Sequence, residues 1–192
     1  EKNNLMDSEI YLKNKFVLSR EKGNLKLRKE SSKENMPKIG IICVPTPIPS
    51  EKINSDIYVN SAVCDFLKNS DGGDIIILES SIEVGTTEKI KKIIYDNGFD
   101  VGVNMGLCFC PERIDPANKE WGIENIPRVI YCSDDSSFGI SMEIYKNINK
   151  GNLLRVNTPK IAEVVKSFEN AFRLVNIALV NEMTLLCDRM GI

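Results

Sequence analysis

The residues best suited to chemistry follow apolar runs of the chain. A carboxylate stands beside an arginine in Pro111-Glu112-Arg113, directly after the run Leu107–Cys110. A carboxylate at the end of a strand can act as a general acid or base, and beside an arginine it can equally form an ion pair. On residue types alone both interpretations stay open, and the ion pair is the commoner of the two.

Hydroxyl groups gather after a second apolar run, Asp74–Leu78, in the segment Glu79-Ser80-Ser81. Gly85 supplies turn freedom a few residues later, and the threonines after it can cap the next helix. The segment is therefore interpreted as a capped strand-to-helix loop. Ser80 and Ser81 also leave the strand where a ligand of an α/β sheet would lie, so the two roles are compatible.

A rigid loop, Val44-Pro45-Thr46-Pro47, follows the first long apolar run. Its two prolines fix the backbone and prevent a helix from starting at once. Such a loop suits the edge of a cofactor site, although a plain turn would look the same.

The chain contains no histidine, which excludes Ser-His-Asp, Cys-His and His-ligated metal mechanisms within it. Its cysteines lie mostly in apolar runs and are interpreted as buried, reduced thiols. Cys108 and Cys110 form the only close pair, and no further ligands stand at a spacing that zinc would need. No metal site is therefore predicted. The six cysteines are Cys43, Cys64, Cys108, Cys110, Cys132 and Cys187.

Composition narrows the class of protein. The 192 residues carry 25 Lys and Arg against 27 Asp and Glu, and 42% of them are hydrophobic. The net charge of −2 argues against a nucleic-acid partner, and the hydrophobic share is that of a globular protein. No apolar run approaches the ~18–20 residues that span a bilayer, and residues 1–14 do not resemble a signal peptide. A cytoplasmic location is expected, and the non-Met start suggests a piece of a longer protein.

Residues 1–38 differ from the rest, with a net charge of +4. They predict a helix of two to three turns, a turn at Gly23-Asn24 and a polar connector through Pro37. The charge excess is typical of a solvated helix face.

Short β-branched runs then alternate with helix-like stretches, which predicts an α/β domain with a doubly wound parallel sheet. Ligands of such sheets bind at the carboxyl ends of the strands. No Gly-x-Gly-x-x-Gly or Walker A segment occurs, so the sheet is expected to lack its first βαβ portion. The predicted strands are Ile39–Val44, Asp74–Leu78, Leu107–Cys110, Arg128–Cys132 and Leu153–Val156; the helices are Ile57–Asn69, Thr86–Asn97 and Ser136–Asn149.

A long helix is predicted from Thr158-Pro159 to about Met190. Its apolar residues recur every three or four positions and form one stripe, interpreted as a packing seam within a helical domain or across a dimer. The opposite stripe is polar and is either solvent-facing surface or one wall of a polar site. Its residues are Glu163, Lys166, Asn170, Arg173 and Asn181.

Together these segments resemble the UDP-glucose/GDP-mannose dehydrogenase family, and within it the UDP-N-acetylglucosamine and UDP-N-acetylmannosamine 6-dehydrogenases. The matching motifs stand in order from residue 41 to the end of the chain. They are Val44-Pro45-Thr46-Pro47, Glu79-Ser80-Ser81 with Gly85-Thr86-Thr87, Pro111-Glu112-Arg113-Ile114-Asp115-Pro116, Ile126-Pro127-Arg128, and Ala162-Glu163-Val164-Val165-Lys166 through Asn181-Glu182.

The resemblance implies an NAD-dependent enzyme that oxidises C6 of a UDP-sugar to the carboxylate with two NAD⁺. Val44, Pro45, Thr46 and Ser80 would then border the NAD cofactor. Ser81, where the family usually has Thr, would hold a water that relays the hydroxyl proton.

The same resemblance assigns the remaining site residues. Glu112 would be a general acid or base, and Lys166 and Asn170 would donate to the developing oxyanion. Glu112, Arg113, Lys166, Asn170 and Arg173 would contact the substrate. The family's nucleophilic Cys would lie beyond this chain, and none of the six cysteines matches it.

The resemblance also implies the organisation of the chain. Residues 1–157 would be the later part of a Rossmann-like NAD-binding domain, and residues 158–192 the first long helix of an all-α central domain. The helix over residues 160–190 would build a homodimer.

Two alternatives stay open. The chain could be an inactive, dimer-forming remnant of such an enzyme, or part of another Rossmann-type dehydrogenase that acts on hydroxyacids or phosphogluconate. Trp121 and Asn125-Ile126-Pro127, after the Glu112 motif, favour UDP-N-acetylglucosamine weakly as the sugar.

Overall fold

The computed structural model describes residues 13–26, 36–48, 54–114 and 120–192. The chain divides into two compact units, Glu1–Ser32 and Lys33–Ile192. In the first unit a helix covers residues 13–21 and ends in a turn at Gly23, whose φ of 72° is left-handed. This confirms the expected helix and turn over the described residues; most of the predicted polar connector lies outside them.

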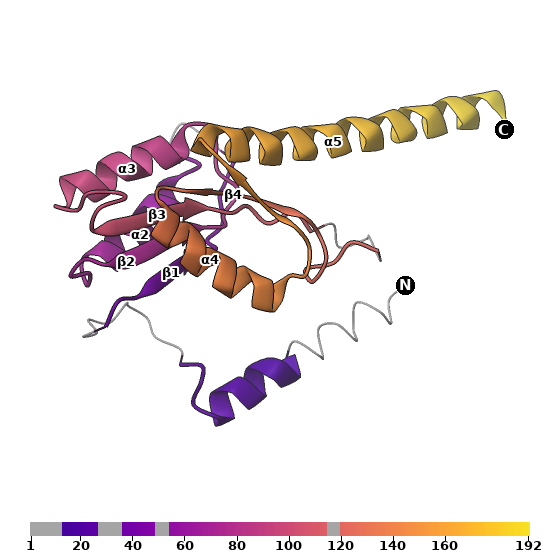
Figure 1. Ribbon diagram of the computed structural model, residues 1–192. Helices are drawn as coiled ribbons and strands as arrows, with labels where there is room; N and C mark the ends of the chain where they lie inside the picture. The colour runs from indigo at the N-terminus through magenta and orange to yellow at the C-terminus, as the bar shows by residue number, and fades with distance from the viewer. Residues whose placement is uncertain (1–12, 27–35, 49–53, 115–119) are drawn as a thin grey trace. The chain divides into compact units, whose positions relative to one another are not determined.

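The second unit is a five-stranded sheet with helices on both faces (Figure 1). The strands stand in the sheet in the order of the chain, β1 to β5. The α/β prediction is therefore confirmed. The bounds of β2, β4 and β5 are those predicted, and the other predicted bounds differ by at most two residues at either end. The elements are β1 (Ile39–Ile42), α2 (Ile57–Leu67), β2 (Asp74–Leu78), α3 (Thr86–Asp96), β3 (Met105–Phe109), β4 (Arg128–Cys132), α4 (Asp135–Ile148), β5 (Leu153–Val156) and α5 (Pro159–Met190).

One junction of the sheet departs from the predicted parallel arrangement. β3 and β4 pair antiparallel, with Cys108 opposite Cys132, whereas all other neighbours are parallel. A parallel return needs a crossover of a dozen or more residues, usually with a helix. The described residues between β3 and β4 contain no helix. The chain therefore reverses at this point, and the expectation of a wholly parallel sheet is wrong there.

Alternate residues of the strands fill two separate hydrophobic clusters. On one face Ile76, Leu78 and Phe109 pack with the apolar sides of α2 and α3; on the other Ile75, Ile77 and Ile130 pack with α4. The central strands are buried on both faces, which is why their sequences are continuously apolar.

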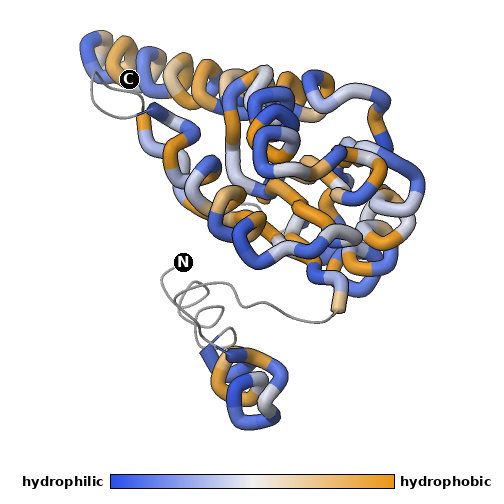
Figure 2. The backbone as a smooth tube through the Cα atoms, turned by 90° about the vertical axis from the view of Figure 1, so that its left-hand side faces the viewer, coloured by the Kyte–Doolittle hydropathy of each residue, from blue (hydrophilic) through white to orange (hydrophobic). Residues whose placement is uncertain are grey.

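Helix α5 leaves the sheet after its first two turns. Ala162, Glu163 and Lys166 are buried, whereas most later side chains are exposed, and the ribbon of α5 extends away from the sheet (Figure 1). Apolar residues recur along this exposed part (Figure 2). Glu163 and Lys166, two residues of the predicted polar stripe, are buried at the start of α5. For these two residues the interpretation of the stripe as solvent-facing surface is therefore wrong.

The cysteines differ in part from the expected set of buried, reduced thiols. Cys108 and Cys132 face each other across β3 and β4 and form a disulfide, because the antiparallel register places both on the same face. Cys110 is a buried free thiol, and Cys43 is exposed. The sequence pattern did not predict that β4 runs antiparallel to β3, and it is this direction that brings the two cysteines together.

Candidate functional site

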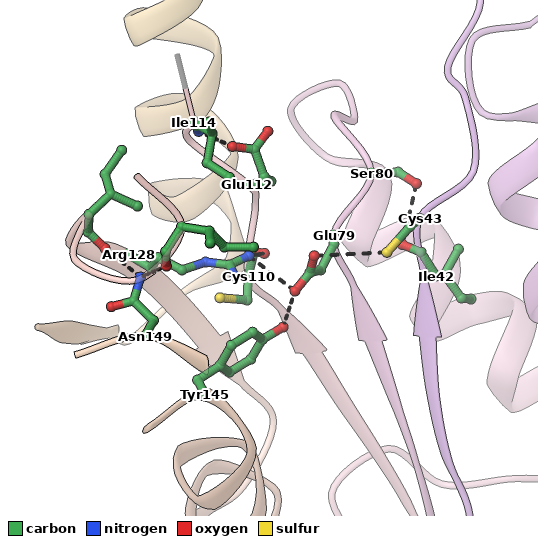
Figure 3. A network of polar contacts seen from close by, with 12 residues as sticks. Ile42, Cys43, Glu79, Ser80, Cys110, Glu112, Ile114, Arg128, Tyr145 and Asn149 are labelled. Carbon is green, nitrogen blue, oxygen red and sulfur yellow. Dashed lines mark hydrogen bonds and ion pairs between the residues drawn. The ribbon is translucent and has the colours of Figure 1, made fainter. Parts of the chain in front are cut away.

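The segments that carry the predicted site residues meet where β1, β2 and β3 end. Because these strands are parallel neighbours, their carboxyl ends share one edge of the sheet (Figure 3). The loops that begin there hold residues 43–47, 79–85 and 110–114.

Ser80 joins the first two of these loops. Its buried hydroxyl donates to the carbonyl of Val44 at 2.8 Å and lies 3.3 Å from the carbonyl of Ile42. Both the hydroxyl and the peptide N–H of Ser80 thus engage the end of β1. Ser80 fixes the shape of this edge, and the neighbouring Ser81 is exposed beside it.

Glu112 and Lys166 come together from distant parts of the chain. The Lys166 ammonium donates to the backbone carbonyl of Glu112, and the Glu112 carboxylate accepts the N–H of Ile114. Lys166 is only 8% exposed, which is unusual for lysine. The structure therefore brings together two of the residues that the resemblance assigns to catalysis.

Burial shifts the pKa values of this pair in opposite directions. Loss of water raises the pKa of the Glu112 carboxyl above its ordinary value, although the neighbouring Lys166 and Arg128 oppose the shift. Loss of water lowers the pKa of the Lys166 ammonium, against the attraction of Glu112 and Glu169. Burial thus favours the neutral form of each group, as at sites of proton transfer.

The other predicted residues on α5 lie close to this pair. Asn170 is exposed one turn after Lys166, and Arg173 is half-buried in the turn that follows. Arg173 also lines a cavity of about 520 Å³ together with Trp121, Phe168 and Phe172. This cavity places aromatic and cationic side chains beside the Glu112 loop.

Arg113 has partners within the chain. Its guanidinium donates to the Glu169 carboxylate through Nε at 2.7 Å and through Nη2, and Nη1 donates to the carbonyl of Pro127 at 2.8 Å. Arg113 thus forms an ion pair with Glu169 on α5, and not with the neighbouring Glu112 as the sequence had suggested.

Sequence reasoning missed a buried polar network at the same edge (Figure 3). Glu79 accepts from Arg128 Nη2 at 3.1 Å and from the Tyr145 hydroxyl at 2.5 Å, and its second oxygen lies 3.8 Å from Cys43 Sγ. Arg128 also donates to the carbonyl of Cys110 at 2.8 Å. The network joins the ends of β1, β2 and β3 to the start of β4. In the sequence, the one sign of it was Arg128, a charged residue at the start of an apolar run.

Burial governs the thiol and the phenol of this network. It raises the pKa of the Cys110 thiol to about 11 and also raises the pKa of the Tyr145 hydroxyl. The pKa of the Cys43 thiol is raised as well, by partial loss of water and by the Glu79 carboxylate. A thiol with a raised pKa is a poor nucleophile, so neither cysteine is suited to covalent catalysis.

Glu163 was placed on the polar stripe of α5, and the structure gives it a role there. Its fully buried carboxylate accepts the N–H of Gly85 at 2.7 Å and the N–H and hydroxyl of Thr87 at 2.8 and 2.7 Å. A carboxylate at the N-terminus of a helix is favoured by the helix dipole. Glu163 therefore caps α3 and docks α5 onto the sheet.

The described residues hold no group of three or more Cys, Asp or Glu side chains that could bind a metal ion. None of the described helices is long and apolar enough to cross a membrane.

Models of one known protein family match both parts of the chain. Residues 2–149 match the NAD-binding domain of the UDP-glucose/GDP-mannose dehydrogenase family, and residues 160–192 match its central domain. The chain belongs to this family. The family assignment that the sequence motifs predicted is confirmed.

The chain is also similar to individual members of the family. The chain is 37% identical over 173 residues to a UDP-N-acetyl-D-mannosamine dehydrogenase of Methanococcus aeolicus, covering 88% of this chain and 38% of the relative. It is 32% identical over 189 residues to the enzyme of that name from Pyrococcus horikoshii, covering 98% and 44%. The chain thus spans less than half the length of these relatives.

Solved structures show the same fold. The UDP-D-ManNAc dehydrogenase of P. horikoshii aligns with a TM-score of 0.70 at 33% identity, covering 80% of this chain and 37% of that one. The UDP-N-acetyl-mannosamine dehydrogenase Cap5O from Staphylococcus aureus aligns with a TM-score of 0.74 at 28% identity, covering 90% and 42%.

Proposed function

We propose that this chain is the part of an NAD-dependent UDP-N-acetylhexosamine 6-dehydrogenase that holds the cofactor edge and the Glu112–Lys166 pair, with UDP-N-acetyl-D-mannosamine as the sugar. The observation that carries the proposal is the contact between the Lys166 ammonium and the Glu112 backbone, across 54 positions of the sequence. The names of the relatives favour mannosamine over the glucosamine that the residues after Glu112 favoured weakly.

The residues of the cofactor edge are compatible with NAD. Val44, Pro45 and Thr46 present a loop at the carboxyl end of β1, and the exposed Ser81 adds a hydroxyl beside it. These groups lie at the carboxyl ends of parallel strands, where sheets of this class bind dinucleotides. When bound, NAD⁺ would accept a hydride from C6 of the sugar.

Each residue of the pair would have a separate task. Lys166 would stabilise negative charge on the C6 oxygen, assisted by Asn170 one turn away. Glu112 would exchange a proton with water or substrate, and the exposed Ser81 would hold a water that takes the hydroxyl proton. Arg173, beside the 520 Å³ cavity, would contact the substrate.

The proposal extends to the assembly and the location of the enzyme. Residues 1–157 would serve the cofactor, and residues 158–192 would open a central domain. The exposed apolar residues of α5, such as Phe172 at 64% and Leu179 at 59%, support a homodimer built on this helix. A cytoplasmic location is in keeping with soluble co-substrates.

The test uses the protein expressed from the complete open reading frame. With NAD⁺ and UDP-N-acetyl-D-mannosamine it should form two NADH for each sugar consumed, and UDP-N-acetylglucosamine and UDP-glucose should react more slowly. The 192 residues alone should form none, since no cysteine here matches the nucleophile. Equal rates with all three sugars would contradict the substrate assignment, and no NADH from any of them would contradict the function.

A further inference from the structure

Arg113 is held more completely than a substrate-binding arginine needs to be. Two of its nitrogens donate to the Glu169 carboxylate and the third to the carbonyl of Pro127. The two charged side chains are largely buried, at 21% and 28% exposed. A guanidinium that meets a carboxylate through two nitrogens forms the strong, directional form of this pair.

The position of this pair in the chain gives it a consequence for the site. Arg113 directly follows Glu112, and Glu169 lies three residues after Lys166 on α5. The Glu112 loop and α5 are therefore joined twice, once by the Arg113–Glu169 ion pair and once by the hydrogen bond from Lys166 to the Glu112 carbonyl. The contact with Pro127 also fastens the loop to the segment before β4.

We propose that Arg113 and Glu169 are positioning residues, which hold the Glu112 loop against α5 so that Lys166 stays buried at the Glu112 backbone. Arg113 also lines the 520 Å³ cavity, and its part in this proposal is to hold the loop. This inference rests on the proposed function only for the chemistry that Glu112 and Lys166 would perform. The geometry that it assigns is a property of the 192-residue chain itself.

The experiment measures the reactivity of the Lys166 amine in that chain, by trace acetylation with acetic anhydride across a range of pH and mass spectrometry. The charged groups around this amine are Glu112 and Arg113 on the loop, and Glu169 and Arg173 on α5. In Glu169→Gln the loop should detach and Lys166 should gain water. The acetylation rate of its neutral amine, taken from the plateau of the pH profile, should then rise by about tenfold, as expected for loss of a charge-assisted hydrogen bond.

The direction of the pKa change separates positioning from simple charge. Loss of water from Lys166 is the main cause of its lowered pKa, so release of the loop in Glu169→Gln should raise that pKa toward its ordinary value. If Glu169 acted only as a nearby negative charge, its removal would lower the pKa of Lys166 further. A lower or unchanged pKa, or an unchanged rate, would overturn the proposal.

Two controls keep this test decisive. Glu182→Gln removes an exposed carboxylate from the same helix and should change nothing at Lys166. Lys91 on α3 reports on the fold, because its acetylation rises only if the domain opens. If Glu169→Gln unfolds the chain, a second variant replaces it. Arg113→Lys keeps the positive charge but cannot donate to the Glu169 carboxylate through two nitrogens. In this variant Lys166 must react faster with acetic anhydride while Lys91 does not. Acetylation needs neither NAD nor sugar, so a failed activity assay leaves this result unaffected.

Discussion

At the scale of single residues, loss of water sets the chemistry of the site. Glu112 and Lys166 are each pushed toward the neutral form by burial, yet they lie within contact of one another. A carboxyl with a raised pKa gives up its proton at a pH closer to neutrality, which suits a group that must both take and return protons. The resemblance named these residues, and their burial supplies a physical reason for the roles proposed for them.

Glu112 makes the pH dependence of the enzyme predictable. A raised pKa keeps its carboxyl protonated above the ordinary value of 4.5, so a reaction that needs the carboxylate should lose rate on the acid side at a pH above that value. Glu112→Gln should lower kcat by about 10²–10⁴-fold and remove this acid limb. The measurement is kcat/KM against pH in the complete enzyme. An acid limb that persists in the variant would assign the titration to another group.

At the scale of elements, one side chain couples the two helices that frame the site. Glu163 on α5 caps α3, which begins just after the Ser80-Ser81 loop. Because its carboxylate is fully buried and accepts three hydrogen bonds, the orientation of α5 depends on it. The same turn of α5 carries Lys166.

Removal of this cap should destabilise the chain. Glu163→Ala leaves the N–H groups of Gly85 and Thr87 without their acceptor and should lower the free energy of unfolding by about 2–4 kcal/mol. Urea denaturation of the 192-residue chain measures this, with the exposed Glu182→Ala as the matched control, expected within about 0.5 kcal/mol of the parent. A loss for Glu163→Ala no larger than for the control would mean that other contacts dock α5.

The elements themselves were largely predictable from the sequence. Apolar runs and capping residues gave every strand and helix of the second unit, because burial on both faces leaves a direct mark on composition. The reversal of β4 was not predictable, since Arg128–Cys132 has the same apolar pattern in either direction. The Cys108–Cys132 pairing followed from that reversal and was missed with it.

The contacts between distant segments of the chain were the part of the site that could not be predicted from the sequence. The spacing of residues on α5 predicted a polar stripe, but it did not show that Glu163 and Lys166 face the sheet. The network of Glu79, Arg128 and Tyr145 joins three elements, and no local pattern records which strand end meets which helix. Resemblance named Glu112 and Lys166, whereas only the fold showed that they touch.

At the scale of the whole molecule, the apolar residues along α5 are the feature that supports the proposed dimer. Its apolar residues recur from Phe168 to Met190 and are about half exposed or more. A seam of this kind is stable in water only when another apolar surface covers it. A second copy of the same helix would meet this need in the proposed dimer.

A charged residue in the apolar stripe of α5 should separate the two chains of the proposed dimer. Leu179→Asp places a carboxylate among the apolar residues and should convert a dimer of the chain to monomer, whereas Asn181→Asp on the opposite side of the helix should leave it dimeric. Sedimentation velocity distinguishes the two states. A parent chain that is monomeric at high concentration would show that α5 is covered in some other way.

The claim that Glu112 and Lys166 form the working site of an NAD-dependent UDP-sugar dehydrogenase has one direct test. In the protein from the complete open reading frame, the rate of NADH formation from UDP-N-acetyl-D-mannosamine is compared between Lys166→Ala and Lys160→Ala, an exposed lysine of the same helix. Lys166→Ala should lower kcat by about 10²–10³-fold, as for loss of an oxyanion donor, while Lys160→Ala stays near the parent rate. A near-parental rate for Lys166→Ala would contradict the account.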